Sequence, residues 1–200
     1  MRIISGSLKG RKLATPKGLT LRPTSDRVKE SMFNILGKEV EGKIVLDLFA
    51  GTGNLGIEAL SRGARRIIFI ENSREAFKLI EKNLLSCGMK DRSEILLKDV
   101  DGAIDMLKRK GETFDLIFMD PPYGKGLIQR TLKKLNIEKI YHDDSILVIE
   151  HNRREPLPDI SEEWNLIAQR RMGDTVISLI MPCLQSPLVG HNRMEKKGDR

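Results

Sequence analysis

The sequence predicts an α/β fold built on a mostly parallel sheet, and three observations lead to this prediction. From Lys43 onward, short apolar runs alternate with segments whose apolar residues recur at helical spacing. A glycine-containing turn joins the first such run to the first helix that follows it. Near the end, Gly173-Asp174 separates two strand-like runs, which is typical of a hairpin turn. We therefore expect a parallel sheet with helices on both faces and an antiparallel C-terminal edge.

The first twenty residues predict a small basic β-hairpin. Residues 2–5 and 11–14 are strand-like, and turn-forming residues join them. No acidic residue precedes Asp26, whereas six basic residues do: Arg2, Lys9, Arg11, Lys12, Lys17 and Arg22. A transit peptide can have this composition, but a folded hairpin explains the pattern better. We expect residues 1–20 to form this extension, residues 21–182 the main domain, and residues 183–200 a flexible tail.

The main domain should begin with a helix near Asp26. Thr24 or Ser25 can cap it, and Gly37 is placed to end it. The other expected helices cover residues 54–61, 74–85, 100–109 and 127–135. The expected strands cover residues 43–49, 66–70, 94–97, 114–119 and 145–149, followed by the hairpin strands 164–171 and 175–181.

Composition narrows the classes of partner and compartment. The chain has 200 residues and a net charge of +7, which favours a polyanion such as nucleic acid as a partner. The two cysteines, Cys87 and Cys183, form no metal-binding or disulfide pattern, so we expect no metal and a cytoplasmic protein. No apolar run approaches membrane length, and we expect no membrane contact.

The most informative segment is Asp120-Pro121-Pro122-Tyr123, which we call the shelf. It follows the apolar run 114–119, a predicted buried strand. Neither proline can donate a backbone N–H, so the strand must end there and the loop must be stiff. A carboxylate, a fixed carbonyl and an aromatic ring at a strand end suit a flat molecule that carries an amino group. The simpler alternative is a proline-rich turn that only ends the strand.

A glycine loop follows the first strand of the main domain. Gly51, Gly53 and Gly56 spell GxGxxG, which also occurs in dinucleotide-binding oxidoreductases. Asp47, just before this loop, distinguishes the two possible ligands. A like-charge contact near 4 Å costs about 4 kcal/mol at an effective dielectric of 20, so the acid disfavours a pyrophosphate. It favours S-adenosylmethionine, which carries an ammonium and a sulfonium.

Two further acids follow the next two strands. Glu71 can accept hydrogen bonds from ribose hydroxyls under either interpretation. Asp99 can accept from an adenine amino group, with Val100 offering a backbone N–H and apolar contact. Asp99 is also placed to be the N-cap of the next helix, and one residue can serve both purposes.

Taken together, these motifs resemble class I S-adenosylmethionine-dependent methyltransferases. The shelf is similar to that of amino-group methyltransferases that act on nucleic acid bases. The segments that carry a closer resemblance, to the bacterial 16S rRNA guanine-N2 methyltransferase (RsmD) family, are 22–30, 47–56, 58–64, 120–123 and 173–175. Met172 departs from this pattern, since a tyrosine usually precedes the glycine-aspartate turn.

The resemblance implies methylation of a guanine N2 amine in 16S rRNA, within the small ribosomal subunit or its precursor, by a Rossmann-like domain. The implied cofactor site comprises Asp47, Ala50, Gly51, Gly53, Glu71, Asn72, Asp99 and Val100. Asp120 and Pro121 would hold the target amine, and Tyr123 would stack on the flipped base, with Pro122 beside it. The expected phosphate-binding residues are Arg2, Arg11, Lys12, Arg22 and Arg27, with Arg153 and Arg154 as further candidates. We expect a monomer.

Three alternatives stay open at the level of sequence. A DNA or other RNA amino-group methyltransferase, acting on adenine N6 or cytosine N4, would use the same shelf. The DNA enzyme would usually need an added domain to read base edges, and no segment is left over to form one. The second alternative is a nicotinamide-dependent oxidoreductase, which Asp47 disfavours. The third is a non-catalytic RNA-binding protein, which the intact shelf disfavours.

Overall fold

The computed structural model describes residues 1–15 and 26–183, and these form one seven-stranded sheet. The strand order is β3-β2-β1-β4-β5-β7-β6. The bounds are β1 (Ile44–Asp47), β2 (Arg66–Glu71), β3 (Ser93–Leu97), β4 (Phe114–Met119), β5 (Tyr141–Asn152), β6 (Trp164–Met172) and β7 (Thr175–Pro182). Strands β1 to β5 pair in parallel, whereas β7 pairs antiparallel with both β5 and β6. The predicted fold class is therefore confirmed.

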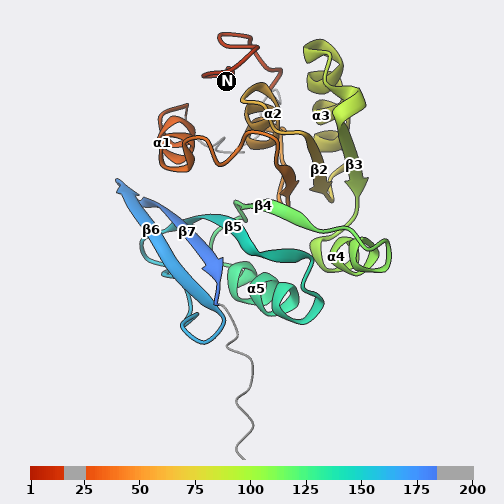
Figure 1. Ribbon diagram of the computed structural model, residues 1–200. Helices are drawn as coiled ribbons and strands as arrows, with labels where there is room; N and C mark the ends of the chain where they lie inside the picture. The colour runs from red at the N-terminus through yellow and green to blue at the C-terminus, as the bar shows by residue number, and fades with distance from the viewer. Residues whose placement is uncertain (16–25, 184–200) are drawn as a thin grey trace, which may run out of the picture.

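Five α-helices and a short 3₁₀ helix complete the described fold. Their bounds are α1 (Asp26–Leu36), α2 (Asn54–Ser61), α3 (Arg74–Cys87), α4 (Val100–Arg109) and α5 (Leu127–Glu138), with η1 at Lys90–Arg92. Figure 1 shows α1, α2 and α3 on one face of the sheet and α4 and α5 on the other. Side chains alternate along each strand, so Val45 joins the first core and its neighbour Leu46 joins the second.

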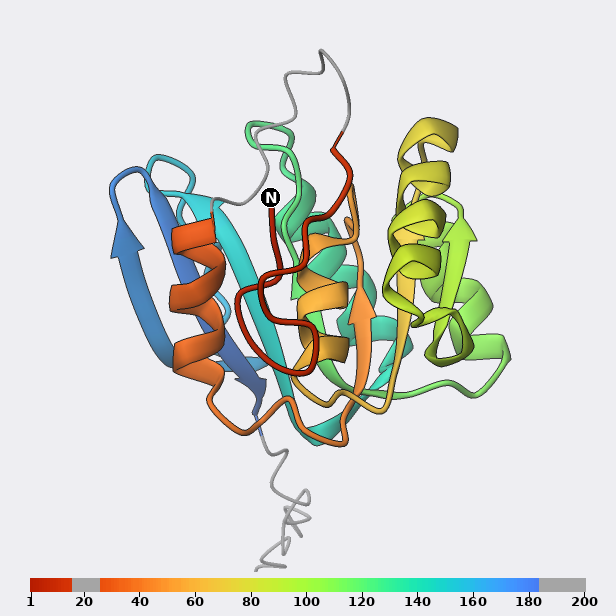
Figure 2. The same cartoon turned by 90° about the horizontal axis from the view of Figure 1, so that it is seen from above.

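The expected N-terminal hairpin is not seen as a pair of strands. Within residues 1–15, which we call the arm, only one isolated antiparallel bridge forms, between Arg2 and Lys12. The two sides of the arm are also joined by backbone hydrogen bonds, in which the Ile3 N–H donates to the Arg11 carbonyl at 2.9 Å and the Gly10 N–H to the Ile3 carbonyl at 2.8 Å. Other backbone groups of the arm bind α2: the Glu58 carboxylate accepts the Ile4 and Ser5 N–H groups at 2.8 and 3.0 Å. Figure 2 shows the arm lying over α2, between α1 and α3.

The other predicted elements are present, with small changes at their ends. Strand β5 begins at Tyr141, earlier than the expected 145. The antiparallel hairpin turns at Gly173, whose φ of 65° lies in the left-handed region that favours glycine. Residues 184–200 of the expected tail lie outside the described residues. The division into extension, main domain and tail stays a prediction.

The parallel register places the ends of β1 and β4 side by side. Asp47, the last residue of β1, has Phe118 of β4 and Phe69 of β2 as its Cα partners. The loops after these strands therefore emerge at one edge of the sheet, which is where ligands bind in open α/β sheets. Among the described residues, every helix is too short or too polar to span a bilayer.

Candidate active site

The glycine loop (residues 48–53) connects β1 to α2 through a tight turn. Gly51 and Gly53 have φ values of 54° and 75°, which disfavour any residue with a Cβ. The Gly53 N–H donates to the Ala50 carbonyl at 2.7 Å, and the Gly51 N–H donates to a Glu71 carboxylate oxygen at 2.8 Å. The third glycine has another role. A Cβ on Gly56 would lie 2.3 Å from Ile67, so this glycine allows α2 to pack closely on the sheet.

Asp47 is a buried carboxylate at the start of this loop. It is 1% exposed, and neither of its oxygens has a donor within hydrogen-bond geometry. Burial, followed by the negative charge of Asp120, raises the pKa of Asp47 to about 7, while the nearby backbone N–H groups of Gly56 and Phe49 act in the opposite direction. A buried carboxylate without donors is costly, and a cationic group would offset that cost.

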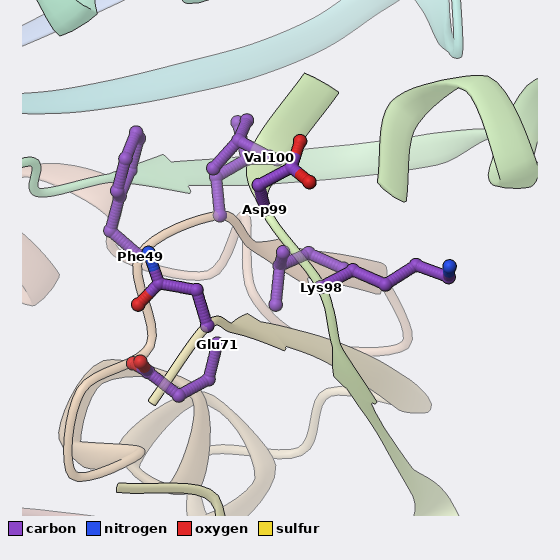
Figure 3. Close-up of a pocket in the computed structure, with 8 residues that line it drawn as sticks. Phe49, Glu71, Lys98, Asp99 and Val100 are labelled. Carbon is purple, nitrogen blue, oxygen red and sulfur yellow. The ribbon is translucent and has the colours of Figure 1, made fainter. Parts of the chain in front are cut away.

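A pocket beside the glycine loop collects residues from the ends of three strands. Figure 3 shows it, with the long Lys98 side chain extending away from Glu71. It is lined by Leu48, Phe49, Ile70, Glu71, Asn72, Lys98, Asp99 and Val100. The Glu71 carboxylate already accepts the Gly51 and Ser73 N–H groups, each at 2.8 Å, but a carboxylate can accept more than two hydrogen bonds.

Asp99 has the capping role that the sequence left open. Its side chain accepts the Gly102 N–H at 2.9 Å as the N-cap of α4. The residue nevertheless lines the pocket, and it is exposed, so the cap leaves carboxylate acceptor capacity for a ligand. Four of the expected cofactor residues (Glu71, Asn72, Asp99 and Val100) line this one pocket, while Asp47, Ala50, Gly51 and Gly53 lie before or within the adjoining loop.

The shelf follows β4 at the same edge of the sheet. Pro121 is buried, Asp120 and Tyr123 are half-buried, and Pro122 is exposed. The Tyr123 hydroxyl donates to the Glu150 carboxylate on β5 at 3.3 Å. Burial, followed by the charge of Glu150, raises the pKa of Tyr123 to about 12, so the phenol stays neutral at physiological pH.

The shelf has a second attachment on its C-terminal side. The Gly124 N–H donates to the Glu155 carboxylate at 2.7 Å. Two carboxylates, one from the neighbouring strand β5 and one from the loop after it, thus hold the loop that carries the aromatic ring. Sequence reasoning missed both, because Glu150 lies in an apolar strand, where an isolated acid was the only signal, and Glu155 in a polar loop that carries no pattern.

The expected RNA-binding residues are dispersed over the arm and α1. Arg2, Arg11 and Lys12 are exposed on the arm, and Arg27 is exposed on α1. Arg22 lies outside the described residues. Arg153 and Arg154 are exposed, and Arg153 forms an ion pair with Asp174 at 2.6 Å. The structure places the expected cofactor and shelf residues after neighbouring strands, whereas the basic residues lie on the arm, on α1 and after β5.

Comparison with known proteins assigns the family. A family model described as Conserved hypothetical protein 95 matches residues 1–181. The ribosomal RNA small subunit methyltransferase D of Escherichia coli K12 is 34% identical, over 90% of this chain and 88% of its own. The protein of the same name from Haemophilus influenzae is also 34% identical, over 86% of this chain and 89% of its own.

The solved structures agree with the sequence relatives. The Escherichia coli protein yhhF superposes with a TM-score of 0.79 at 34% identity, covering 91% of this chain and 97% of that one. These likenesses extend over the arm, the sheet and both loops, so the resemblance drawn from the motifs is confirmed. The chain therefore belongs to the Conserved hypothetical protein 95 family, that of ribosomal RNA small subunit methyltransferase D, and has the fold of class I S-adenosylmethionine-dependent methyltransferases.

Proposed function

We propose that this protein uses S-adenosylmethionine to methylate the exocyclic N2 amine of a guanine in 16S rRNA. The observation that carries the proposal is the adjacency of the glycine loop and the shelf. Both follow neighbouring parallel strands, with Asp47 paired in register to Phe118, two residues before Asp120. A methyl donor on one loop and a base on the other would meet at a single edge of the sheet.

The residues present fit this cofactor. Asp47 has no donor of its own, and both Asp120 and Glu71 add negative potential around it, which suits the ammonium and sulfonium groups. Asp47, Ala50, Gly51 and Gly53 would hold the methionine side. Glu71 and Asn72 would hold the ribose, while Asp99 and Val100 would hold the adenine. When bound, the cofactor supplies an electrophilic methyl group.

The shelf residues would prepare the amine. A guanine amine is a poor nucleophile because its lone pair is delocalised into the ring. The Asp120 carboxylate and the Pro121 carbonyl would accept its two hydrogens and favour a pyramidal nitrogen, whose lone pair is then less delocalised and free to point at the methyl group. Asp120 would also stabilise the positive charge that grows on nitrogen. No strong general base is needed, since the amine becomes acidic once it is alkylated.

Tyr123 would stack on the extruded base, with Pro122 exposed beside it. The arm and α1 would contact phosphates through Arg2, Arg11, Lys12 and Arg27, and the same role is proposed for Arg22. A net charge of +7 supports an RNA partner, which we take to be the small ribosomal subunit or its precursor. Action as a monomer and a cytoplasmic location stay predictions.

The oxidoreductase alternative is disfavoured by the same carboxylate that favours the methyl donor. A pyrophosphate at the glycine loop would face Asp47 where no protein donor compensates its charge. Family membership also separates this chain from that class. An amino-group methyltransferase with another base as target remains the competing outcome of the test below.

Incubation of the protein with labelled S-adenosylmethionine tests the proposal. The substrates to compare are small ribosomal subunits that lack the modification, free 16S rRNA and duplex DNA. We expect incorporation into the ribosomal substrates, at a guanine N2 when the modified nucleotide is mapped. Methylation of DNA but not of subunits, or of adenine N6 or cytosine N4, would contradict it.

A further inference from the structure

The arm is attached to the cofactor-binding half of the protein by buried polar side chains. The Ser61 hydroxyl on α2 accepts the Leu8 N–H at 3.0 Å and donates to the Ser5 carbonyl at 2.7 Å. Glu58, one turn earlier on the same helix, accepts two further arm N–H groups. The arm is therefore fixed on the helix that directly follows the glycine loop.

Lys29 strengthens this attachment from α1. Its side chain is fully buried, and its ammonium donates to the Arg2 carbonyl and to the Asn54 side-chain oxygen, both at 2.7 Å. It also pairs with the equally buried Glu58 at 3.1 Å. A buried ion pair is weak evidence for a gain in stability, because desolvation offsets the attraction. Its plainer effect is to fix the arm against Asn54, the first residue of α2 after the glycine loop.

Asn83 on α3 joins the other end of the arm to the glycine loop itself. It is 1% exposed, and its side-chain oxygen accepts the Ala14 N–H at 2.8 Å. Its amide nitrogen donates to the Ala14 carbonyl at 3.2 Å and to the Thr52 carbonyl at 3.1 Å. Thr52 lies between the two glycines with positive φ. One buried amide thus holds the arm and the cofactor loop at the same time.

We propose that Asn83 is a positioning residue that couples RNA binding at the arm to cofactor binding at the glycine loop. The inference rests on the proposed function, because it requires the arm to contact RNA. RNA that binds the arm would hold its end in this position, and with it the amide of Asn83 and the Thr52 carbonyl. The coupling is reciprocal, so bound cofactor strengthens RNA binding by the same factor.

The test measures the dissociation constant of S-adenosylhomocysteine by equilibrium dialysis, with and without saturating unmodified small subunits. In the wild-type protein we expect subunits to tighten binding about fivefold, the lower end of typical coupling. In Asn83→Ala the ratio should fall close to one. Ser86→Ala is the matched control, because Ser86 lies on the same helix and bonds only the carbonyl of Asn83 and the neighbouring Cys87. It should keep the wild-type ratio.

A second variant separates positioning from folding. Asn83→Asp keeps an acceptor for the Ala14 N–H but places a carboxylate oxygen against the Ala14 and Thr52 carbonyls, so it should keep one bond to the arm and still lose the coupling. A wild-type ratio of one, or a full ratio in a folded Asn83→Ala or Asn83→Asp variant, would overturn the inference. A wild-type protein that binds S-adenosylhomocysteine but methylates no ribosomal substrate would instead overturn the proposed function.

Discussion

The glycine loop and the shelf follow neighbouring strands, yet the polar groups of these two loops differ in how far the protein itself supplies their hydrogen-bond partners. The shelf is stiffened by two prolines and held by Glu150 of the neighbouring strand and Glu155 of the loop after it. The glycine loop is held by hydrogen bonds from the backbone N–H groups of Ala50, Gly51 and Gly53, whereas the Asp47 carboxylate has no donor within hydrogen-bond geometry. The shelf is thus held by protein partners, whereas the glycine loop adjoins a buried carboxylate that a cationic ligand would compensate. From this difference we expect the shelf to offer a rigid surface to the proposed base, and the glycine loop to favour a positively charged cofactor.

The largest expected effect comes from removing the carboxylate of the shelf. Asp120→Ala should keep cofactor binding but lose about 100- to 1000-fold in kcat, because an acceptor that stabilises developing charge is gone. Methyl transfer to unmodified small subunits measures the loss, and calorimetry with S-adenosylhomocysteine checks binding. Asp143→Ala, an exposed acid on β5, is the control. Wild-type turnover in Asp120→Ala would refute the role given to the shelf.

The second prediction concerns the uncompensated charge of the glycine loop. Because the pKa of Asp47 is raised to about 7, the unliganded protein holds a proton that a cationic cofactor should expel. Affinity for S-adenosylhomocysteine should therefore rise by about 20-fold between pH 5.5 and pH 7.5. Calorimetry in buffers of different ionisation enthalpy should detect the released proton, and Asp47→Asn should abolish both effects. A flat pH profile in the wild-type protein would contradict this.

The same shift has a consequence for folding. Asp47 ionises near its ordinary pKa in the unfolded chain but keeps its proton up to about pH 7 in the folded one. The folded state then binds more protons between pH 4 and 7, so the stability of the unliganded protein should fall as pH rises through that window. The contribution is about 4 kcal/mol for a shift of this size. Denaturant unfolding of wild-type protein and Asp47→Asn at pH 5 and pH 7.5 measures the part of it that is lost in this interval, about 2.5 kcal/mol, and only the wild type should lose it.

The next prediction tests the aromatic ring of the shelf. Tyr123→Ala should cost about tenfold in kcat/KM, since stacking on a base contributes about 1–3 kcal/mol. Tyr123→Phe keeps the ring and loses only the bond to Glu150, so it should retain most of the activity. Equal losses in both variants would show that the hydroxyl and its carboxylate partner matter more than stacking.

The comparison also shows how far the sequence predicts this molecule. The strands, the helices and the edge where both loops meet follow from apolar periodicity and from glycine and proline signals, which are local in sequence. Asn83, Lys29 and Glu150 could not be predicted in the same way, because their partners lie 25 to 69 residues away. The spacing of Asn54 and Glu58, four residues apart on a buried helix, was the available signal that α2 has a polar face. The hairpin expected at the N-terminus is present only as one bridge and a few backbone hydrogen bonds, and the Ile4 and Ser5 N–H groups bind that polar face of α2.

The smallest expected effect concerns the exposed charges of the arm. Each lysine or arginine that contacts a phosphate releases counterions, so a double Arg11→Ala and Lys12→Ala variant should reduce the slope of log affinity against log salt by about 1 to 2. Affinity for unmodified small subunits, measured over a series of salt concentrations, gives that slope. The charge-matched control is a double Arg65→Ala and Lys43→Ala variant, because these residues precede β2 and β1 at the opposite end of the strands from the shelf. This variant should leave the slope unchanged. An unchanged slope in the arm variant would show that the arm does not contact RNA. The coupling proposed for Asn83 would then be wrong, because it requires that contact. The roles proposed for the glycine loop and the shelf would not be affected.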